Sequence, residues 1–327
     1  MPAETKANRL RQIEALLLEH PEGLTQAEIA RRMGVHRSTI LRNLADIPGL
    51  CADEHGRLTI DRSTYLVQVR MSLHEATALH LAARLMATRM DKQNPHAAAV
   101  LRKLALALDQ LAPRASRAIA CSADQLDGID KKSAPTYLAV LETLTLAWAE
   151  GRKARIWHHS PGGEVKEYVF SPYFLEPSAV GQSVYAIGRR EPPGAMRTLK
   201  VERIDRAELL ADRFCLPQNF DPYRLLSDAW GIWYTDQPPV EVVLLFSPKV
   251  AERVAETRWH PGEQVDPQPD GSLIWRVEIA EPLEMLPWIR GWGAEVEVLA
   301  PEKMRELLMD EAHRLVRVYH LRMEDNE

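Results

Sequence analysis

The segment from Leu24 to Leu44 constrains the fold of this chain more than any other, because it predicts two short helices joined by a very tight turn. Thr25 and Glu28 have the spacing of a capping box, in which each side chain accepts a hydrogen bond from the backbone amide of the other residue. Gly34 ends the first of these helices, and the next is predicted from about residue 36 to residue 47. Two helices joined by such a glycine turn are typical of a helix-turn-helix.

A further helix and a hairpin flank this pair. Apolar residues recur at helical spacing from Leu10 to Leu17, which predicts a helix before the pair. After the pair, residues 50–51 and 57–60 are predicted strands, and Glu54-His55-Gly56 connects them as a wing. We therefore interpret residues 1–62 as a winged helix-turn-helix domain.

The basic residues of this domain concentrate around the turn and the third helix. Residues 1–62 hold nine basic and nine acidic residues, yet residues 31–42 hold four arginines and no acidic residue. A basic helix in this position enters the major groove of DNA, while flanking cations contact phosphates. The alternative is a helical module whose arginine face is only solvated. On the first interpretation, phosphate contacts are expected from Arg31, Arg32 and Arg57, and base-edge contacts from Arg37, Ser38, Arg42 and Asn43, with His36 and Thr39 beside them.

The next part of the chain is predicted to be a helical linker, residues 63–134. Two helices are expected between Ser72 and Pro113, the first opened by a capping box of Ser72 with Glu75 and the second by Asn94-Pro95. Residues 114–134 show no sustained period and are predicted to be a loop or an irregular link.

Residues 135–213 predict a small, strongly bent antiparallel barrel. Pro135 starts a helix that ends at Gly151, and turns follow at residues 160–163 and 192–194. Strand-like runs are seen at residues 154–158, 165–170, 183–188 and 197–204.

The remainder, residues 214–327, predicts alternating strands and helices after a linker. This alternation suggests a ferredoxin-like split βαβ layer, so the whole chain is expected to be an α+β multidomain protein. The predicted elements are strand 240–246, helix 248–259, strand 273–279, helix 282–291, strand 294–299 and a final helix to about residue 321.

Charge and composition limit the class of protein. The net charge of −5 comes from the C-terminal part, because residues 214–327 hold 11 basic and 21 acidic residues. No apolar run approaches the ~20 residues that span a bilayer, and the polar N-terminus has no secretory signal. Three cysteines far apart in the chain fit reduced thiols. We expect a cytoplasmic protein with no membrane partner, no metal and no cofactor.

The chain resembles the WYL-domain transcriptional regulators over nearly its whole length. The name-giving Trp-Tyr-Leu is represented by Val184-Tyr185-Ala186, with Leu199 where an aromatic residue is usual, His158 in place of a frequent tyrosine and Tyr168 where a basic residue is common. The resemblance implies an Sm-like barrel as ligand sensor, a dimer, and nucleic-acid or nucleotide ligands. It rests on Leu24–Leu44, Ser72-Leu73-His74-Glu75-Ala76, Pro172-Tyr173-Phe174-Leu175, Val184-Tyr185-Ala186-Ile187-Gly188, the run from Met196 to Ile204, Pro269-Asp270-Gly271-Ser272, Trp288 and Leu299-Ala300-Pro301.

A phosphate-binding site is predicted in the barrel. An uninterrupted strand would place Arg197 and Arg203 on one face, because their spacing is even, and two guanidiniums facing one way suit phosphate. Tyr185 is a candidate for stacking a base or for the core. The other candidates are His158, Ser160, Arg189 and Arg190. In the alternative, these arginines pair with Glu202, Asp205 or Glu208 on a solvated surface.

Enzyme motifs are not found in the sequence. His74-Glu75 and His80 lack the spacing of a zinc protease, and the adjacent His158 and His159 would point to opposite faces of a strand. Gly162-Gly163 lacks the lysine of a phosphate loop. The six tryptophans between residues 230 and 292 are expected in the core or an interface.

The function expected from the sequence is therefore a ligand-responsive transcriptional regulator. It would bind a symmetric double-stranded DNA operator as a homodimer built by the helical layer or the C-terminal layer, and a single-stranded nucleic acid or a nucleotide would alter its operator affinity. The alternative is a nucleic-acid-binding accessory protein that regulates an enzyme partner.

Overall fold

The computed structural model describes residues 5–324 apart from 64, 67–68, 90–91, 129–133, 161, 179–182, 193 and 236, and the side chains of 86–89 and 320–324 are also not described. The chain divides into two compact units. The first comprises Met1–Pro172 and Ile204–Phe214, and the second comprises Tyr173–Arg203 and Cys215–Glu327. The predicted division into four domains stays a prediction.

The N-terminal part of the first unit has three helices and a hairpin, as predicted. The capping box of Thr25 and Glu28 is present, and Gly34 adopts a left-handed conformation with φ 66°, which ends the second helix without a Cβ penalty. A continuous core joins all five elements and includes Ile13, Ile29 and Ile40. The elements are α1 (Lys6–Glu19), α2 (Gln26–Met33), α3 (Arg37–Leu44), β1 (Leu50–Ala52) and β2 (Leu58–Ile60).

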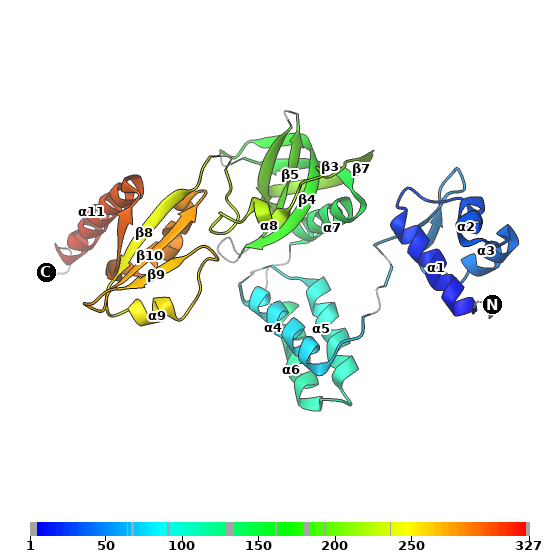
Figure 1. Ribbon diagram of the computed structural model, residues 1–327, viewed down its shortest axis with the longest axis horizontal. Coiled ribbons are helices and arrows are strands. Elements are labelled where there is room, and N and C mark those ends of the chain that lie inside the picture. Colours follow the sequence, from blue (N-terminus) through cyan, green and yellow to red (C-terminus); the bar gives the residue numbers. More distant parts are fainter. Residues whose placement is uncertain are drawn as a thin grey trace. The chain divides into compact units, whose positions relative to one another are not determined.

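Three helices follow, where two were predicted. The helices α4 (Leu73–Arg89) and α5 (Pro95–Leu108) begin at the predicted caps, Ser72 with Glu75 and Asn94. The prediction of an irregular link after residue 114 is wrong for its first half, because α6 (Pro113–Leu126) is a helix that packs on α4 and α5 (Figure 1).

The face of α6 explains why its periodicity is weak in the sequence. Small residues occupy much of its buried side, among them Ser116 and Ala123. The Ser116 hydroxyl donates a hydrogen bond of 2.9 Å to the carbonyl of Ala105, so a polar residue serves as a core position. Residues 129–133 of the predicted link lie outside the described residues.

The predicted barrel region contains one helix and a five-stranded sheet in the order β6-β5-β4-β3-β7. The helix α7 packs on β3 and β7, and two register shifts between these strands bend the sheet. Since β6 and β7 are the outer strands of this order, the sheet is not closed, and the Sm-like barrel stays a prediction. The elements are α7 (Pro135–Glu150), β3 (Arg152–His159), β4 (Val165–Ser178), β5 (Ser183–Glu191), β6 (Ala195–Lys200), η1 (Val201–Arg203) and β7 (Ile204–Arg213).

The prediction of one strand across residues 197–204 is wrong. Strand β6 ends at Lys200, and the 3-10 helix η1 turns the chain into β7. The turn buries Val201 completely and leaves Ile204 only 2% exposed. These two apolar residues fit the pattern of a strand in the sequence, but in the structure their burial stabilises the turn.

The C-terminal part is an antiparallel sheet with helices. Its order is β11-β8-β10-β9, so β10 lies between β8 and β9, which are joined through α9 (Figure 1). The strands β8 and β10 have the predicted bounds, whereas α9 is shorter than predicted. The elements are α8 (Pro222–Leu225), β8 (Val240–Phe246), α9 (Ala251–Ala255), β9 (Gln264–Pro267), β10 (Leu273–Ile279), η2 (Pro282–Met285), α10 (Leu286–Arg290), η3 (Gly293–Glu295), β11 (Val296–Ala300) and α11 (Glu302–Glu324).

Tryptophans fill the core of this C-terminal layer. Trp275 is fully buried, and Trp288 contacts four other tryptophans at ring-centroid distances of 4.8–6.1 Å. The prediction that the tryptophans lie in the core is therefore confirmed for Trp275, Trp288 and the three others that Trp288 contacts. The exception is Trp233, which is 49% exposed. Within the described ranges, no helix is long and apolar enough to cross a membrane.

His80 makes the stability of the helical layer pH-dependent. Its Nε2 lies 2.9 Å from the Ser122 hydroxyl, and Arg84 is bound to the same hydroxyl. Burial and, to a smaller extent, the charge of Arg84 lower the pKa of His80 below its ordinary value of 6.5. The unfolded chain therefore binds more protons than the folded one at acid pH, and stability falls as the pH drops through about 6.5.

We expect the thermal midpoint of the wild type to fall from pH 7.5 to pH 5.5 by more than that of His80→Gln, whose neutral side chain cannot titrate. Thermal unfolding followed by circular dichroism measures both differences. An equal pH response of the two proteins would show that His80 is not the group responsible.

Candidate functional site

The start of α3 presents a basic, exposed surface. Arg37, Ser38 and Arg42 are all exposed, and Leu41 beside them is 58% exposed. Nε of Arg37 donates to the side-chain oxygen of Gln26 at 3.3 Å, and Nε of Arg42 donates to the Ser38 carbonyl at 3.2 Å. These bonds use one nitrogen of each guanidinium, so both forks retain donors toward solvent.

The helix start is set by the imidazole of His36. Its Nδ1 accepts a hydrogen bond from the backbone amide of Ser38 at 3.3 Å and lies 2.8 Å from the Ser38 hydroxyl. Thr39 is partly buried, with its amide bound to the His36 carbonyl at 2.8 Å. His36 therefore acts as the N-cap of α3, a role that the sequence did not suggest.

Two of the predicted DNA contacts serve the domain itself. Asn43 is only 4% exposed and its amide donates to the Thr39 carbonyl at 2.5 Å, so the prediction that it lies on the outward face is wrong. The guanidinium of Arg57 donates to the carbonyls of Glu22 and Gly23 at 2.6–3.2 Å, where it holds the turn before α2. Arg31 and Arg32 are exposed at the end of α2, and Arg32 is hydrogen-bonded to His20.

The wing tip is acidic. Asp53 and Glu54 are exposed, and the Asp53 carboxylate accepts hydrogen bonds from the amides of His55 and Arg57 at 2.9 and 2.8 Å. A carboxylate in this position disfavours close approach of a phosphate backbone, so the basic surface belongs to α2 and α3 rather than to the hairpin.

The second group of predicted residues does not form the expected arrangement. His158 and Ser160 belong to the first unit, and the five others belong to the second. In the β5–β6 pair Tyr185 lies opposite Lys200, while Arg197 lies opposite Gly188. Opposed residues share a face and neighbours along a strand alternate, so Tyr185 and Arg197 lie on opposite faces.

Arg203 lies near Tyr185, although strand β6 ends at Lys200 and Arg203 belongs to η1. Burial raises the pKa of the Tyr185 hydroxyl, and the charges of Lys200, Glu202, Arg203 and Glu284 also act on it. Two cations and two carboxylates therefore lie around a half-buried phenol. Lys200 and Glu202 form an ion pair of 2.8 Å.

The alternative that these arginines pair with Glu202, Asp205 or Glu208 on a solvated surface is not what the structure shows for Arg197 and Arg203. The three carboxylates that it invoked are bound to other side chains: Glu202 to Lys200, Asp205 to the His159 imidazole at 2.7 Å, and Glu208 to Arg206 and, at 4.0 Å, to Arg155. Among the described residues, no ion pair joins Arg197 or Arg203 to these carboxylates. Arg197 donates instead to the carbonyl of Met196 at 2.9 Å. Arg189 folds over the turn at Gly194, and Arg190 lies on the same strand.

A cavity of about 140 Å³ lies against Tyr185. Its size is below that of a whole nucleotide site, so it suits one group of a larger ligand. The sequence gave no reason to select the residues that share it. They are Ser178, Ile232, Trp233, Leu283, Glu284 and Pro287.

Glu284 builds one wall of this cavity. It is 6% exposed, and its carboxylate accepts hydrogen bonds from the backbone amides of Gly231, Ile232 and Trp233 at 2.9, 2.8 and 3.1 Å. A Cβ at Gly231 would lie 2.9 Å from a carboxylate oxygen, so the close approach requires glycine. The segment 231–233 is thereby fixed beside Tyr185.

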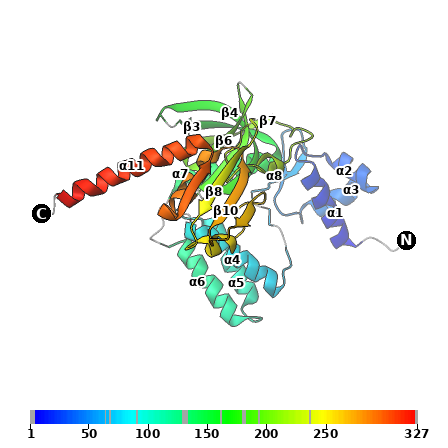
Figure 2. The same ribbon diagram turned by 60° about the vertical axis from the view of Figure 1, so that its left-hand side comes forward.

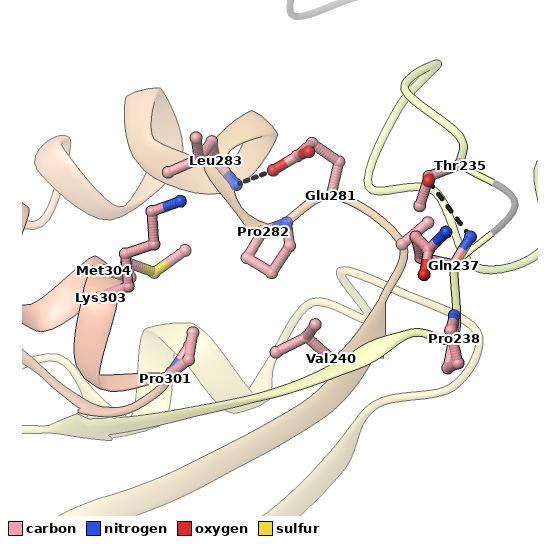
Figure 3. Close-up of a pocket in the computed structure, with 11 residues that line it drawn as sticks. Thr235, Gln237, Pro238, Val240, Glu281, Pro282, Leu283, Pro301, Lys303 and Met304 are labelled. Carbon is pink, nitrogen blue, oxygen red and sulfur yellow. Dashed lines mark hydrogen bonds between the residues drawn. The ribbon is translucent and has the colours of Figure 1, made fainter.

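A second, larger cavity of about 280 Å³ lies in the C-terminal layer (Figure 3). Val240, Pro282, Pro301 and Met304 give it apolar walls, and the Lys303 side chain borders it. The polar groups of Thr235 and Gln237 lie at the opposite end, where the amide of Gln237 donates to the Thr235 hydroxyl at 3.2 Å. No predicted ligand residue contributes to it.

Three domain families match the chain: an HTH domain at residues 9–50, a WYL domain at 139–209 and a WCX domain at 238–316. No curated protein sequence matches. Among solved structures, proteasome accessory factor B/C (PafBC) of Arthrobacter aurescens is 21% identical over 92% of this chain and 47% of its own, with a TM-score of 0.30. A CRISPR Cas-related protein is 11% identical over 78% and 89%, with a TM-score of 0.40. This chain thus spans about half the length of the first structure, and neither likeness bears on function.

The three domains occur in a defining order and together span more than half of the chain. With an HTH domain, a WYL domain and a C-terminal extension, the chain belongs to the WYL-domain transcriptional regulators. None of the matched families is an enzyme family.

We expect Glu284→Ala to destabilise the protein by roughly 3 kcal/mol, because one buried and two partly buried amides lose their carboxylate acceptor. The matched control is Glu278→Ala, an exposed carboxylate on β10 whose loss should cost less than about 0.5 kcal/mol. Urea unfolding followed by tryptophan fluorescence measures both. Equal small effects would mean that the amides find water instead and that Glu284 does not fix the segment.

Proposed function

We propose that this protein is a transcriptional regulator that binds a symmetric DNA operator as a dimer and changes its operator affinity when a phosphate-bearing ligand binds the WYL region. The observation that carries the proposal is the exposed basic start of α3, set by a capped helix pair, in a chain that continues into WYL and WCX domains. Footprinting on upstream DNA tests it: a protected, roughly two-fold symmetric site supports a regulator, whereas equal binding of all duplexes contradicts it.

The proposed DNA-binding surface comprises two sets of residues. Arg37, Ser38 and Arg42 lie at the start or on the exposed side of α3, and we assign them to base edges, with His36 and Thr39 adjoining. Arg31 and Arg32 at the end of α2 are assigned to phosphates. Asn43 and Arg57 are now assigned to the framework of the domain, since their polar groups are bound inside it.

The ligand site is proposed on the Tyr185 face of the β5–β6 pair. Lys200 and Arg203 supply cations near the Tyr185 hydroxyl, and the cavity beside it accepts one group of the ligand. A nucleotide or a short single-stranded nucleic acid fits this chemistry, because both combine phosphate with a base that stacks on an aromatic ring. Arg189, Arg190, His158 and Ser160 remain candidate contacts outside this cavity.

Two finer statements about the fold are also proposals. The bent five-stranded sheet is proposed to be a partly open form of an Sm-like barrel. The C-terminal sheet is proposed to be ferredoxin-like, which is supported by the position of β10 between two strands joined through a helix.

Substitutions in the proposed DNA-binding surface should separate sequence reading from phosphate binding. Arg37→Ala and Arg42→Ala should each weaken operator binding by about 1–3 kcal/mol and weaken binding to unrelated DNA much less. Arg31→Ala should weaken both and reduce the salt slope by about one. Fluorescence anisotropy with operator and scrambled duplexes over a salt series measures these effects. Equal losses for all three variants would contradict the assignment.

Substitutions in the WYL region should separate the two faces of the β5–β6 pair. Calorimetric titration with a short single-stranded DNA oligonucleotide should show weaker binding for Lys200→Ala with Arg203→Ala, and unchanged binding for Arg197→Ala, which lies on the other face. Operator DNA should change the affinity for the oligonucleotide by the same factor by which the oligonucleotide changes the affinity for operator DNA. The coupling free energy is typically ~1–3 kcal/mol. Loss of binding with Arg197→Ala alone would move the site to that face.

A further inference from the structure

The first half of α11 is fixed to the C-terminal sheet. Met304 is 1% exposed in the core, and Arg305 donates to the Val298 carbonyl at 3.1 Å while pairing with Glu297 at 2.9 Å. One and a half turns later, Glu311 pairs with Arg290 at 2.9 Å. From residue 312 to residue 319 every side chain is exposed. Figure 2 shows α11 extending well past the strands of this sheet.

The apolar face that packs on the sheet continues into the exposed half. Met304, Leu308, Leu315 and Tyr319 follow one another at spacings of 4, 7 and 4, which keeps them on one side of a helix. Met304 and Leu308 belong to the core cluster, but Leu315 is 51% exposed and Tyr319 is 63% exposed. Val316 and Val318 add further apolar surface, 54% and 50% exposed. A solvated helix end would carry polar residues at these positions.

The charge of this exposed half is opposite to that of the domain that carries it. Residues 312–319 contain Arg314 and Arg317 and no acidic residue, whereas residues 214–311 contain 8 basic and 18 acidic residues. The arm, defined as residues 312–319, therefore complements in charge the surface of a C-terminal domain like its own.

We propose that the arm docks on the C-terminal domain of a second copy of this chain. The eight residues of the arm extend the helix by roughly 12 Å, enough to reach a neighbouring molecule, and a continuous straight helix does not bring them back onto their own sheet. In a two-fold dimer the exchange is reciprocal, so two arms contribute to one interface and the buried area doubles. The inference rests on the dimer of the proposed function and assigns its surface.

The test is the mass of the full-length protein in solution. Leu315→Glu with Tyr319→Glu should raise the dimer dissociation constant at least about 100-fold, because two apolar anchors become charged. Leu106→Glu is the matched control, since this leucine is 78% exposed on α5 and should have no effect. Sedimentation equilibrium measures the constants. Since the arm lies outside the core, the far-ultraviolet circular dichroism spectrum of the double variant should match that of the wild type, which shows that the protomer still folds.

Hydrogen exchange tests whether the arm binds the C-terminal domain of the second copy. Amides that lose protection in the double variant, beyond α11, should lie between residues 238 and 300, and high salt should weaken the dimer because the contact pairs basic with acidic surface. A dimer that survives the double substitution overturns the inference and leaves the regulator proposal intact. Dissociation by Leu106→Glu, or lost protection in α4–α6, would assign the interface to the helical layer. A monomeric wild type overturns the dimer itself, whereas operator binding is judged separately by footprinting.

Discussion

A single buried carboxylate fixes the surroundings of the candidate ligand site. The segment 231–233 has no regular structure, so its amides need an acceptor once they are removed from water. Glu284 supplies it from the turn between β10 and α10, and the segment then lies against Tyr185 of β5. A loop held by three bonds to one charged group is a preformed wall rather than a wall that a ligand must order, and the entropic cost of binding falls accordingly.

The two polar regions of the protein differ in how they are made. The proposed DNA-binding surface consists of side chains around the start of α3, and local rules position them: a capping box, a glycine turn and an N-cap. The proposed ligand region needs residues from β5, β6, η1 and η2, which are up to about a hundred positions apart in the chain. Its geometry depends on strand register and on which residues end a strand, and neither is encoded locally.

This contrast explains which predictions succeeded. The helix caps at Thr25, Ser72 and Asn94 were predictable because each is a local pattern with a specific hydrogen bond. The burial of Asn43 was also open to prediction, since residues 40, 43, 44 and 47 share one helix face, but its polar side chain suggested a DNA contact, whereas in the structure its amide donates to the Thr39 carbonyl. Strand β9 was missed because all four residues are exposed at a sheet edge and show no alternation. Glu284 read as one more acidic residue, because only the fold brings the three amides to it.

The acidic wing has a consequence for the range of concentrations over which the protein can act. In the proposed dimer, a DNA-binding surface whose hairpin repels phosphates relies on α2 and α3 of each subunit, and one recognition helix contacts only a few base pairs. Occupancy of a full operator then depends on how many subunits are already paired, so below the dimer dissociation constant it rises roughly with the square of protein abundance. In the proposed arrangement, synthesis and turnover of the protein would set a threshold for regulation, and the proposed ligand would act on top of that threshold.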